Sequence, residues 1–330
     1  DADVALIYYS GHGIEAKGEN FIAPIDTDLK TPQSAGDSMI AVQPILDVLA
    51  KIVPVSIVLL DACRSDPFPP GQMIVLPGDT TPTPVDGQGL AAVRGPVPVA
   101  AKAADPTSLG AVIGFSASPG EPALDGAPGE NSPYAAALLK HFAAGGYSFG
   151  DLMTLVSEEV YLKTKARQLP WVNSSLRRVL SFGKPVEPTG DDAAAIREGR
   201  RQLLLQIAQQ PAETQRYVEA VATEQGGPLY ALDGMLKVLG VDGAGQGDLE
   251  KQLLQGAQKL KDFMAEKPSA AMTDPDLIRL AGLAEEAQSE GTLDLALKYR
   301  AEASIRADTL SHNLDQTEAD LEGSRLQLGE

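Results

Sequence analysis

Short runs of hydrophobic residues alternate with longer amphipathic stretches in the first half of the chain. Three such runs, at residues 4–10, 55–62 and 110–118, predict strands. Each is apolar at consecutive positions, which is typical of strands in a parallel sheet that is covered by helices on both faces. Apolar residues at helical spacing predict a helix over residues 39–52.

Two more helical stretches begin at Ser132 and Phe149, and the apolar run at residues 177–182 predicts a last strand. This alternation indicates an α/β layered domain over residues 1–183. Inside it, the proline-rich stretch at residues 67–109 is too long for an ordinary connection and predicts an exposed linker.

The pattern changes after residues 184–192, a stretch of Gly, Pro and acidic residues that predicts an interdomain linker. No strand-like run follows. Residues 193–267 predict a series of helices, and residues 274–330 predict helices that include a hairpin with its turn near Gly291. The fold class expected is therefore an α/β domain followed by an all-α region.

The hairpin carries a set of residues at the spacing of a tetratricopeptide repeat, which would make residues 274–330 tetratricopeptide-like. The set is Leu280, Leu283, Ala284, Ala287, Gly291, Ala296 and Ala303. Arg300 departs from the pattern, which has a large apolar residue there, and no proline closes the repeat. A generic helical hairpin remains the alternative.

Charge and cysteine content exclude several classes of function. The net charge of -18 argues against nucleic acid and anionic membranes as partners, because both bind clustered Lys and Arg. A single cysteine forms neither an intramolecular disulfide nor a cysteine-based zinc site, so it is a buried thiol, a reactive thiol or an intermolecular link. No loop has a clear calcium-binding pattern, and we expect no metal or other cofactor.

The first residues run directly into the strand at residues 4–10, with neither an initiator Met nor a leader. We therefore expect this chain to be truncated at its N-terminus. The compartment in which it works stays open.

Two predicted strands end in residues suited to catalysis. His12 lies between two glycines in "YYSGHG", and Cys63 follows the second strand in "LLDACRS". Residues that follow neighbouring parallel strands meet at one edge of the sheet. A histidine there would take the thiol proton and raise the nucleophilicity of the cysteine, and backbone N–H groups would stabilise an oxyanion.

The two motifs together resemble those of the caspase-like cysteine peptidases, which include caspases, paracaspases, metacaspases and bacterial relatives. His12 lies 51 residues before Cys63, close to the spacing of about 50 in caspases. The resemblance extends over residues 1–183. It implies that Cys63 is the nucleophile, that His12 is the acid/base, and that the N–H groups of Gly13 and Cys63 form the oxyanion hole.

The resemblance also implies a specificity. Caspases have Gln two residues before the cysteine, whereas this chain has Asp61, as paracaspases and metacaspases do, and there the residue lines the S1 pocket. Asp125 lies where those relatives have a second S1 acid. Acids in S1 select a basic P1 side chain, because a buried carboxylate without a partner is costly. We therefore expect protein or peptide substrates with Arg or Lys at P1.

The linker at residues 67–109 corresponds to the region between the large and small subunits of caspases. Arg94 in "AAVRGP" is a candidate site of autoprocessing. The strands and helix that normally precede the histidine strand of this fold are absent from the chain.

A second hypothesis is a catalytically inactive caspase-like scaffold that binds protein partners through its C-terminal helices. A Ser-His hydrolase is excluded by the lack of any G-x-S-x-G motif.

Overall fold

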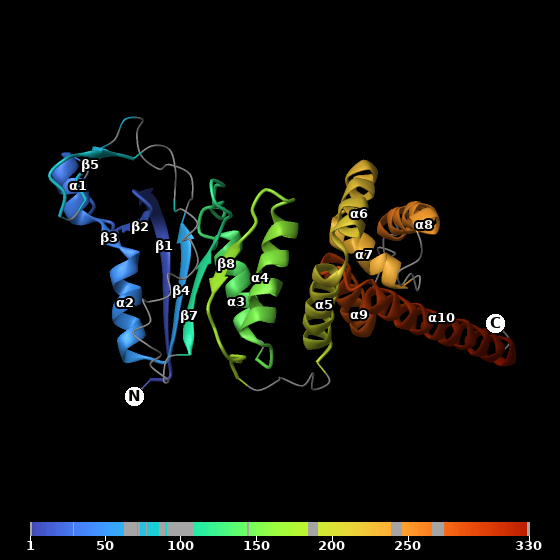
Figure 1. Ribbon diagram of the computed structural model, residues 1–330. Helices are drawn as coiled ribbons and strands as arrows, with labels where there is room; N and C mark the ends of the chain where they lie inside the picture. Colours follow the sequence, from blue (N-terminus) through green and yellow to red (C-terminus); the bar gives the residue numbers. More distant parts are fainter. Residues whose placement is uncertain are drawn as a thin grey trace. The chain divides into compact units, whose positions relative to one another are not determined.

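The computed structural model describes residues 2–28, 30–62, 71, 73–76, 78–85, 90, 109–143, 145–183, 191–238, 246–265 and 274–328. The chain divides into two compact units, Asp1–Val186 and Glu187–Glu330 (Figure 1). Each unit has its own hydrophobic core, so each is described by itself.

A six-stranded sheet in the order β3-β2-β1-β4-β7-β8 forms the centre of the first unit (Figure 1). Its strands are β1 (Val4–Ala16), β2 (Glu19–Ala23), β3 (Ile40–Ala41), β4 (Val55–Ala62), β7 (Gly110–Phe115) and β8 (Trp171–Ser174). The central strands β1, β4 and β7 are parallel, and β2, β3 and β8 extend the sheet as antiparallel strands. A separate two-stranded sheet joins β5 (Met73–Ile74) to β6 (Thr83–Pro84). The expected α/β class with a parallel centre is confirmed.

Helices cover both faces of β4 and β7, which is why these strands are apolar at consecutive positions. Helix α2 (Val42–Ile52) packs with Val58 and Leu60 on one face. Helices α3 (Pro133–Phe142) and α4 (Phe149–Lys163) pack with Ile57 and Leu59 on the other face. The short helix α1 (Pro32–Ser38) packs with β5 in a smaller cluster.

Strand β1 changes partner along its length. Residues Val4 to Gly11 pair with β4 in parallel, and residues His12 to Ala16 pair with β2 in an antiparallel hairpin. His12 therefore lies where the chain leaves the parallel sheet.

The prediction of a last strand at residues 177–182 was wrong. The strand is β8, four residues long, and within residues 177–182 only Ser181 forms an isolated bridge, with Ser148. The apolar residues of that run serve another purpose: the ring of Phe182 lies 5.7 Å from that of Phe142 and 6.1 Å from that of Phe149, centroid to centroid. Leu180 and Phe182 thus pack with the cluster of α3 and α4, whereas Val179 is 84% exposed.

The second unit is helical throughout its described residues. Its helices are α5 (Asp192–Gln209), α6 (Ala212–Gln225), α7 (Leu229–Val238), α8 (Gln246–Ala265), α9 (Pro275–Ser289) and α10 (Leu293–Leu328). The expected hairpin turn is present at Gly291, whose φ of 77° favours glycine. None of the described helices is long and apolar enough to cross a membrane.

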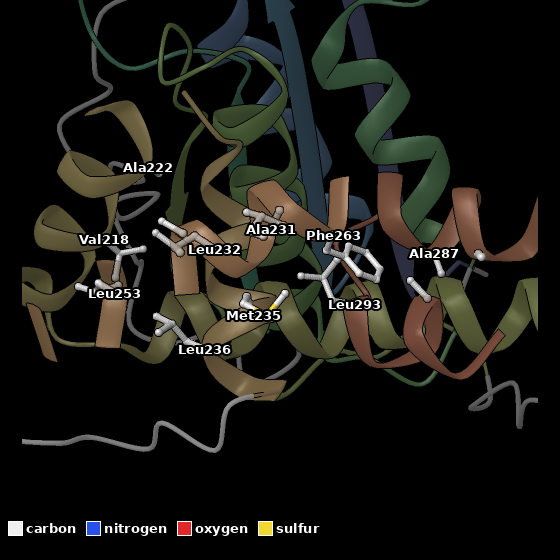
Figure 2. Close-up of a cluster of buried hydrophobic side chains, with 14 of the residues drawn as sticks. Val218, Ala222, Ala231, Leu232, Met235, Leu236, Leu253, Phe263, Ala287 and Leu293 are labelled. Atoms are coloured by element: carbon white, nitrogen blue, oxygen red, sulfur yellow. The ribbon is translucent and has the colours of Figure 1, made fainter. Parts of the chain in front are cut away.

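Side chains from α5 to α10 form the core of this unit, with Val218, Leu232, Leu253 and Leu293 among them (Figure 2). Arg300 of α10 contacts Phe263, a residue of this core. Its guanidinium lies 3.8 Å from the ring centroid of Phe263, and Nη1 donates a hydrogen bond to the Phe263 carbonyl. Arg300 thus links α10 to α8 where a repeat consensus would have an apolar residue.

Candidate active site

The site lies where the parallel pairing of β1 and β4 ends. Gly11 pairs with Ala62 in the parallel register, and these residues directly precede His12 and Cys63 in the sequence. Cys63 and the candidate processing site Arg94 lie outside the described residues. The register therefore brings together the two positions from which the predicted dyad follows.

His12 is exposed at the surface, but its main chain is held in place. The Tyr9 hydroxyl lies 2.8 Å from the carbonyl oxygen of His12 and 2.8 Å from that of Ala23 in β2. A Cβ at Gly11 would lie only 2.5 Å from the same hydroxyl, so glycine leaves the room that Tyr9 occupies. Desolvation by burial raises the pKa of Tyr9, which keeps the hydroxyl protonated as a donor.

Gly13, the predicted oxyanion-hole residue, is buried beside His12. A Cβ at this position would meet the Leu90 side chain at 2.8 Å. Leu90 is fully buried although it belongs to the stretch at residues 67–109, which the sequence predicted to be exposed. The described part of that stretch was therefore predicted wrongly: it includes β5 and β6, and its apolar residues pack against the rest of the first unit.

Asp61 is the most distinctive charged group at this edge. It is the penultimate residue of β4 and only 6% exposed. Its Oδ2 accepts hydrogen bonds from the Tyr8 hydroxyl at 2.9 Å and from the Ser132 hydroxyl at 2.5 Å. Burial raises the pKa of the Asp61 carboxyl, while the hydroxyls of Ser132, Tyr8 and Ser116 partly offset that effect. These donors are neutral, and no described residue supplies a cation to Asp61.

Asp125 is exposed on the loop between β7 and α3. Its charge contributes to the raised pKa of Asp61, so the structure brings the two predicted S1 acids into electrostatic contact. The next residue, Gly126, approaches the Asn131 carbonyl so closely that a Cβ would collide with it.

Gln168 fixes the start of the same loop. It is 1% exposed, and its side-chain amide donates to the Ser116 carbonyl at 2.8 Å. Its Oε1 accepts a hydrogen bond from the N–H of Leu124 at 2.9 Å, directly before Asp125. Gln168 therefore ties the Asp125 loop to the end of β7.

A second tyrosine lies behind Asp61. The Tyr134 hydroxyl is buried and has no hydrogen-bond partner among the described residues. Desolvation, followed by the charge of Asp61, raises its pKa. Asp61 therefore lies in an environment rich in hydroxyl groups, contributed by β1, by the residue directly after β7, and by the N-cap and first turn of α3.

Sequence reasoning missed Tyr8, Tyr9, Ser132 and Gln168. The two tyrosines precede the "SGHG" motif, and Ser132 precedes a helix, so each has an ordinary explanation as a strand or capping residue. Only their partners across the fold reveal that they contact the site. Among the described residues, no cluster of three or more His, Cys, Asp and Glu residues could hold a metal ion.

Comparison with known proteins agrees with this architecture. A model of the caspase domain, the peptidase C14 family, matches residues 1–181 of the chain. The chain belongs to the caspase-domain family. Members of this family are typically cysteine peptidases.

Among solved structures, the chain is similar to the crystal structure of caspase-1 from Spodoptera frugiperda. The alignment has 18% sequence identity and a TM-score of 0.35, and covers 56% of this chain. It spans 66% of that caspase-1 chain, just under two thirds. None of the curated proteins compared with the chain matches it.

Proposed function

We propose that this caspase-family chain is a cysteine endopeptidase that cleaves after Arg or Lys. Cys63 is the nucleophile and His12 the acid/base. The N–H groups of Gly13 and Cys63 form the oxyanion hole. The observation that carries the proposal is the pairing of Gly11 with Ala62, because it aligns the residues from which His12 and Cys63 follow.

In this mechanism the His12 imidazole takes the proton of the Cys63 thiol, and the thiolate attacks the carbonyl carbon of the P1 residue. The N–H groups stabilise the oxyanion of the tetrahedral intermediate. His12 then gives the proton to the leaving amine, and a thioester remains on Cys63. A water molecule, deprotonated by His12, hydrolyses the thioester and restores the free thiol.

Two acids support the preference for a basic P1 side chain. Asp61 is buried with neutral hydroxyl donors, and Asp125 is close enough to raise its pKa. A guanidinium or ammonium would supply the charge that neither hydroxyl provides. Substrates that lack it would leave the buried Asp61 carboxylate without a compensating charge, which disfavours their binding.

The test compares fluorogenic peptides that differ only at P1, with Arg, Lys, Gln or Asp. We expect the full chain to hydrolyse the Arg and Lys peptides and not the others, and Cys63→Ala and His12→Ala to be inactive. An Arg-based electrophile should label the wild type once, at Cys63. A chain that neither turns over the peptides nor reacts with the electrophile would instead be the inactive scaffold.

We also propose that the helical unit is tetratricopeptide-like at α9 and α10 and binds a protein partner. Its support is packing: Leu280, Ala284, Ala287 and Ala296 are buried, as small and apolar residues of such a repeat are. Variants with substitutions on the surface of the helical unit should lose a partner that co-purifies with the wild type and should retain peptidase activity. If no protein co-purifies with the wild-type chain, the proposed binding role of the helical unit is contradicted.

A further inference from the structure

Two adjacent tyrosines of β1 contact different parts of the candidate site. Tyr8 donates to the Asp61 carboxylate at 2.9 Å, and Tyr9 lies 2.8 Å from the His12 carbonyl. Successive side chains of a strand point to opposite faces of the sheet, so one dipeptide reaches both sides of β1. Both tyrosines thus contact the candidate site through other site residues, Asp61 and His12.

We propose that Tyr8 and Tyr9 are positioning residues with separate tasks: Tyr8 orients the specificity carboxylate Asp61, and Tyr9 orients the catalytic His12. This proposal rests on the proposed function, because it assigns Asp61 to substrate binding and His12 to the chemical step. It adds two residues that touch neither the substrate nor the reacting atoms.

The case for Tyr8 rests on the geometry around Asp61. Tyr8 and Ser132 donate to the same oxygen, Oδ2, from β1 and from the N-terminus of α3. Two donors on one oxygen fix the rotation of the carboxylate. Because both donors are neutral, they orient the negative charge without cancelling it, and the charge remains for a basic side chain.

The case for Tyr9 rests on the change of partner in β1. The Tyr9 hydroxyl contacts the carbonyl oxygens of His12 in β1 and Ala23 in β2, directly after β1 leaves β4. The contact therefore holds the main chain at His12 while the imidazole remains exposed. The space for the hydroxyl exists because Gly11 has no Cβ.

Replacing each tyrosine by phenylalanine removes the hydroxyl and keeps the ring. The Tyr9 ring packs against the α2 face of the core, and this packing is kept in phenylalanine, whereas Tyr8 is 43% exposed. Tyr8→Phe and Tyr9→Phe are therefore matched variants, one residue apart on the same strand, and each is the other's control.

Kinetics of the full chain on an Arg peptide test the division of tasks. We expect Tyr8→Phe to raise KM about tenfold and leave kcat within about twofold, since it loses a hydrogen bond to a charged group. We expect Tyr9→Phe to lower kcat about threefold to tenfold with KM nearly unchanged. Equal effects of both variants on KM and kcat, or no effect of either, would overturn the proposal.

The pH profile gives a second readout that loss of packing would not produce. The Tyr8 hydrogen bond lowers the pKa of Asp61, so its loss raises that pKa further. The acid limb of kcat/KM should then move to higher pH in Tyr8→Phe and stay in place in Tyr9→Phe. Movement in Tyr9→Phe alone would reverse the assignment.

NMR separates this inference from the proposed function, because it needs no turnover. In the chain with ¹³C-labelled aspartate, Tyr8→Phe should raise the pKa of the Asp61 carboxyl and leave the His12 ring signals unchanged. Tyr9→Phe should shift the His12 ring signals and leave Asp61 unchanged. If the wild type is inactive but both responses occur, the peptidase proposal is wrong and the positioning contacts are supported. If the wild type is active but the responses do not occur, the peptidase proposal stands and the positioning roles are wrong.

Discussion

Gly11 of β1 pairs with Ala62 of β4 in the parallel register. This pairing makes the predicted dyad a consequence of strand alignment, because His12 and Cys63 each follow one of the two residues. A slip of one residue between β1 and β4 would displace Gly11 along the sheet relative to Ala62 by about 3.3 Å, the rise per residue of a strand. The register is held by apolar residues that are buried on both faces of β4.

Asp61→Asn should stabilise the fold and remove the specificity. Burial raises the pKa of the Asp61 carboxyl above its usual value of 3.8. Such a group favours folding below its usual pKa and disfavours folding as the pH rises. We therefore expect Asp61→Asn to match the wild type at about pH 3–4 and to be more stable at neutral pH. Hydrolysis of the Arg peptide should be lost at the same time.

Urea unfolding followed by tryptophan fluorescence measures this effect in the caspase unit alone, because the chain has a single tryptophan, Trp171, in β8. A stability difference that does not grow with pH would contradict the buried-charge explanation. Retained hydrolysis of the Arg peptide would contradict the S1 role of Asp61.

Glu159→Gln should strongly destabilise the same unit. Glu159 is fully buried between α3 and α4, and its carboxylate lies 3.2 Å from Nζ of Lys163, 3.5 Å from Nζ of Lys140 and 3.5 Å from Nε2 of His141. Lys163 is half exposed and Lys140 is partly exposed, so water can solvate the charges that remain. We therefore expect a loss of about 1.5–3 kcal/mol, the contribution of a hydrogen bond to a charged group. Trp171 fluorescence during urea unfolding reports the change.

Asp79→Asn is the matched control in this unit. Asp79 pairs with Lys17 at 2.7 Å, but both side chains are exposed, so the loss should be at most about 1 kcal/mol. Equal losses for Glu159→Gln and Asp79→Asn would mean that burial adds nothing to the value of the pair.

Arg300→Lys should loosen the helical unit although it keeps the charge. Arg300 stacks on Phe263, and its Nη2 donates to Oε1 of Gln288 at 2.7 Å. Lysine has neither the planar group nor the fork, so we expect a loss of about 1–2 kcal/mol. Hydrogen exchange should become faster in α8 and α10 and stay unchanged in the caspase unit.

Lys298→Arg is the control, because it makes the reverse substitution at an exposed position of the same helix. Lys298 lies 3.9 Å from Glu302 on the surface. We expect no change in hydrogen exchange. Faster exchange in both variants would show that α10 responds to any change of its basic residues.

Autoprocessing after Arg94 remains a prediction about a residue outside the described ranges. If the proposed specificity holds, incubation should convert the full chain into fragments 1–94 and 95–330. Intact-mass measurements should find both fragments in the wild type and neither in Cys63→Ala or Arg94→Gln. Intact chains in all three samples would exclude processing at this position.

The sequence predicted best where local pattern and packing agree. Residues 4–10, 55–62 and 110–118 are apolar at consecutive positions, and all three contribute to the central parallel strands. The prediction failed at residues 177–182, where the run of apolar residues neither forms a strand nor is buried throughout. Phe182 packs in an aromatic cluster and not against a neighbouring strand, and Val179 is 84% exposed.

The sequence by itself determined the fold class and the family, because the apolar runs and the "SGHG" and "DACRS" motifs are local patterns along strands and at their ends. The residues that it assigns to the proposed chemistry stay a prediction. Only the tertiary structure decided that Tyr8 meets Asp61 and that Tyr9 meets His12. Tyr8 and Asp61 are 53 residues apart in the chain. Such hydrogen bonds depend on which strands pair, in which register, and on which face each side chain lies, and no local pattern encodes all three.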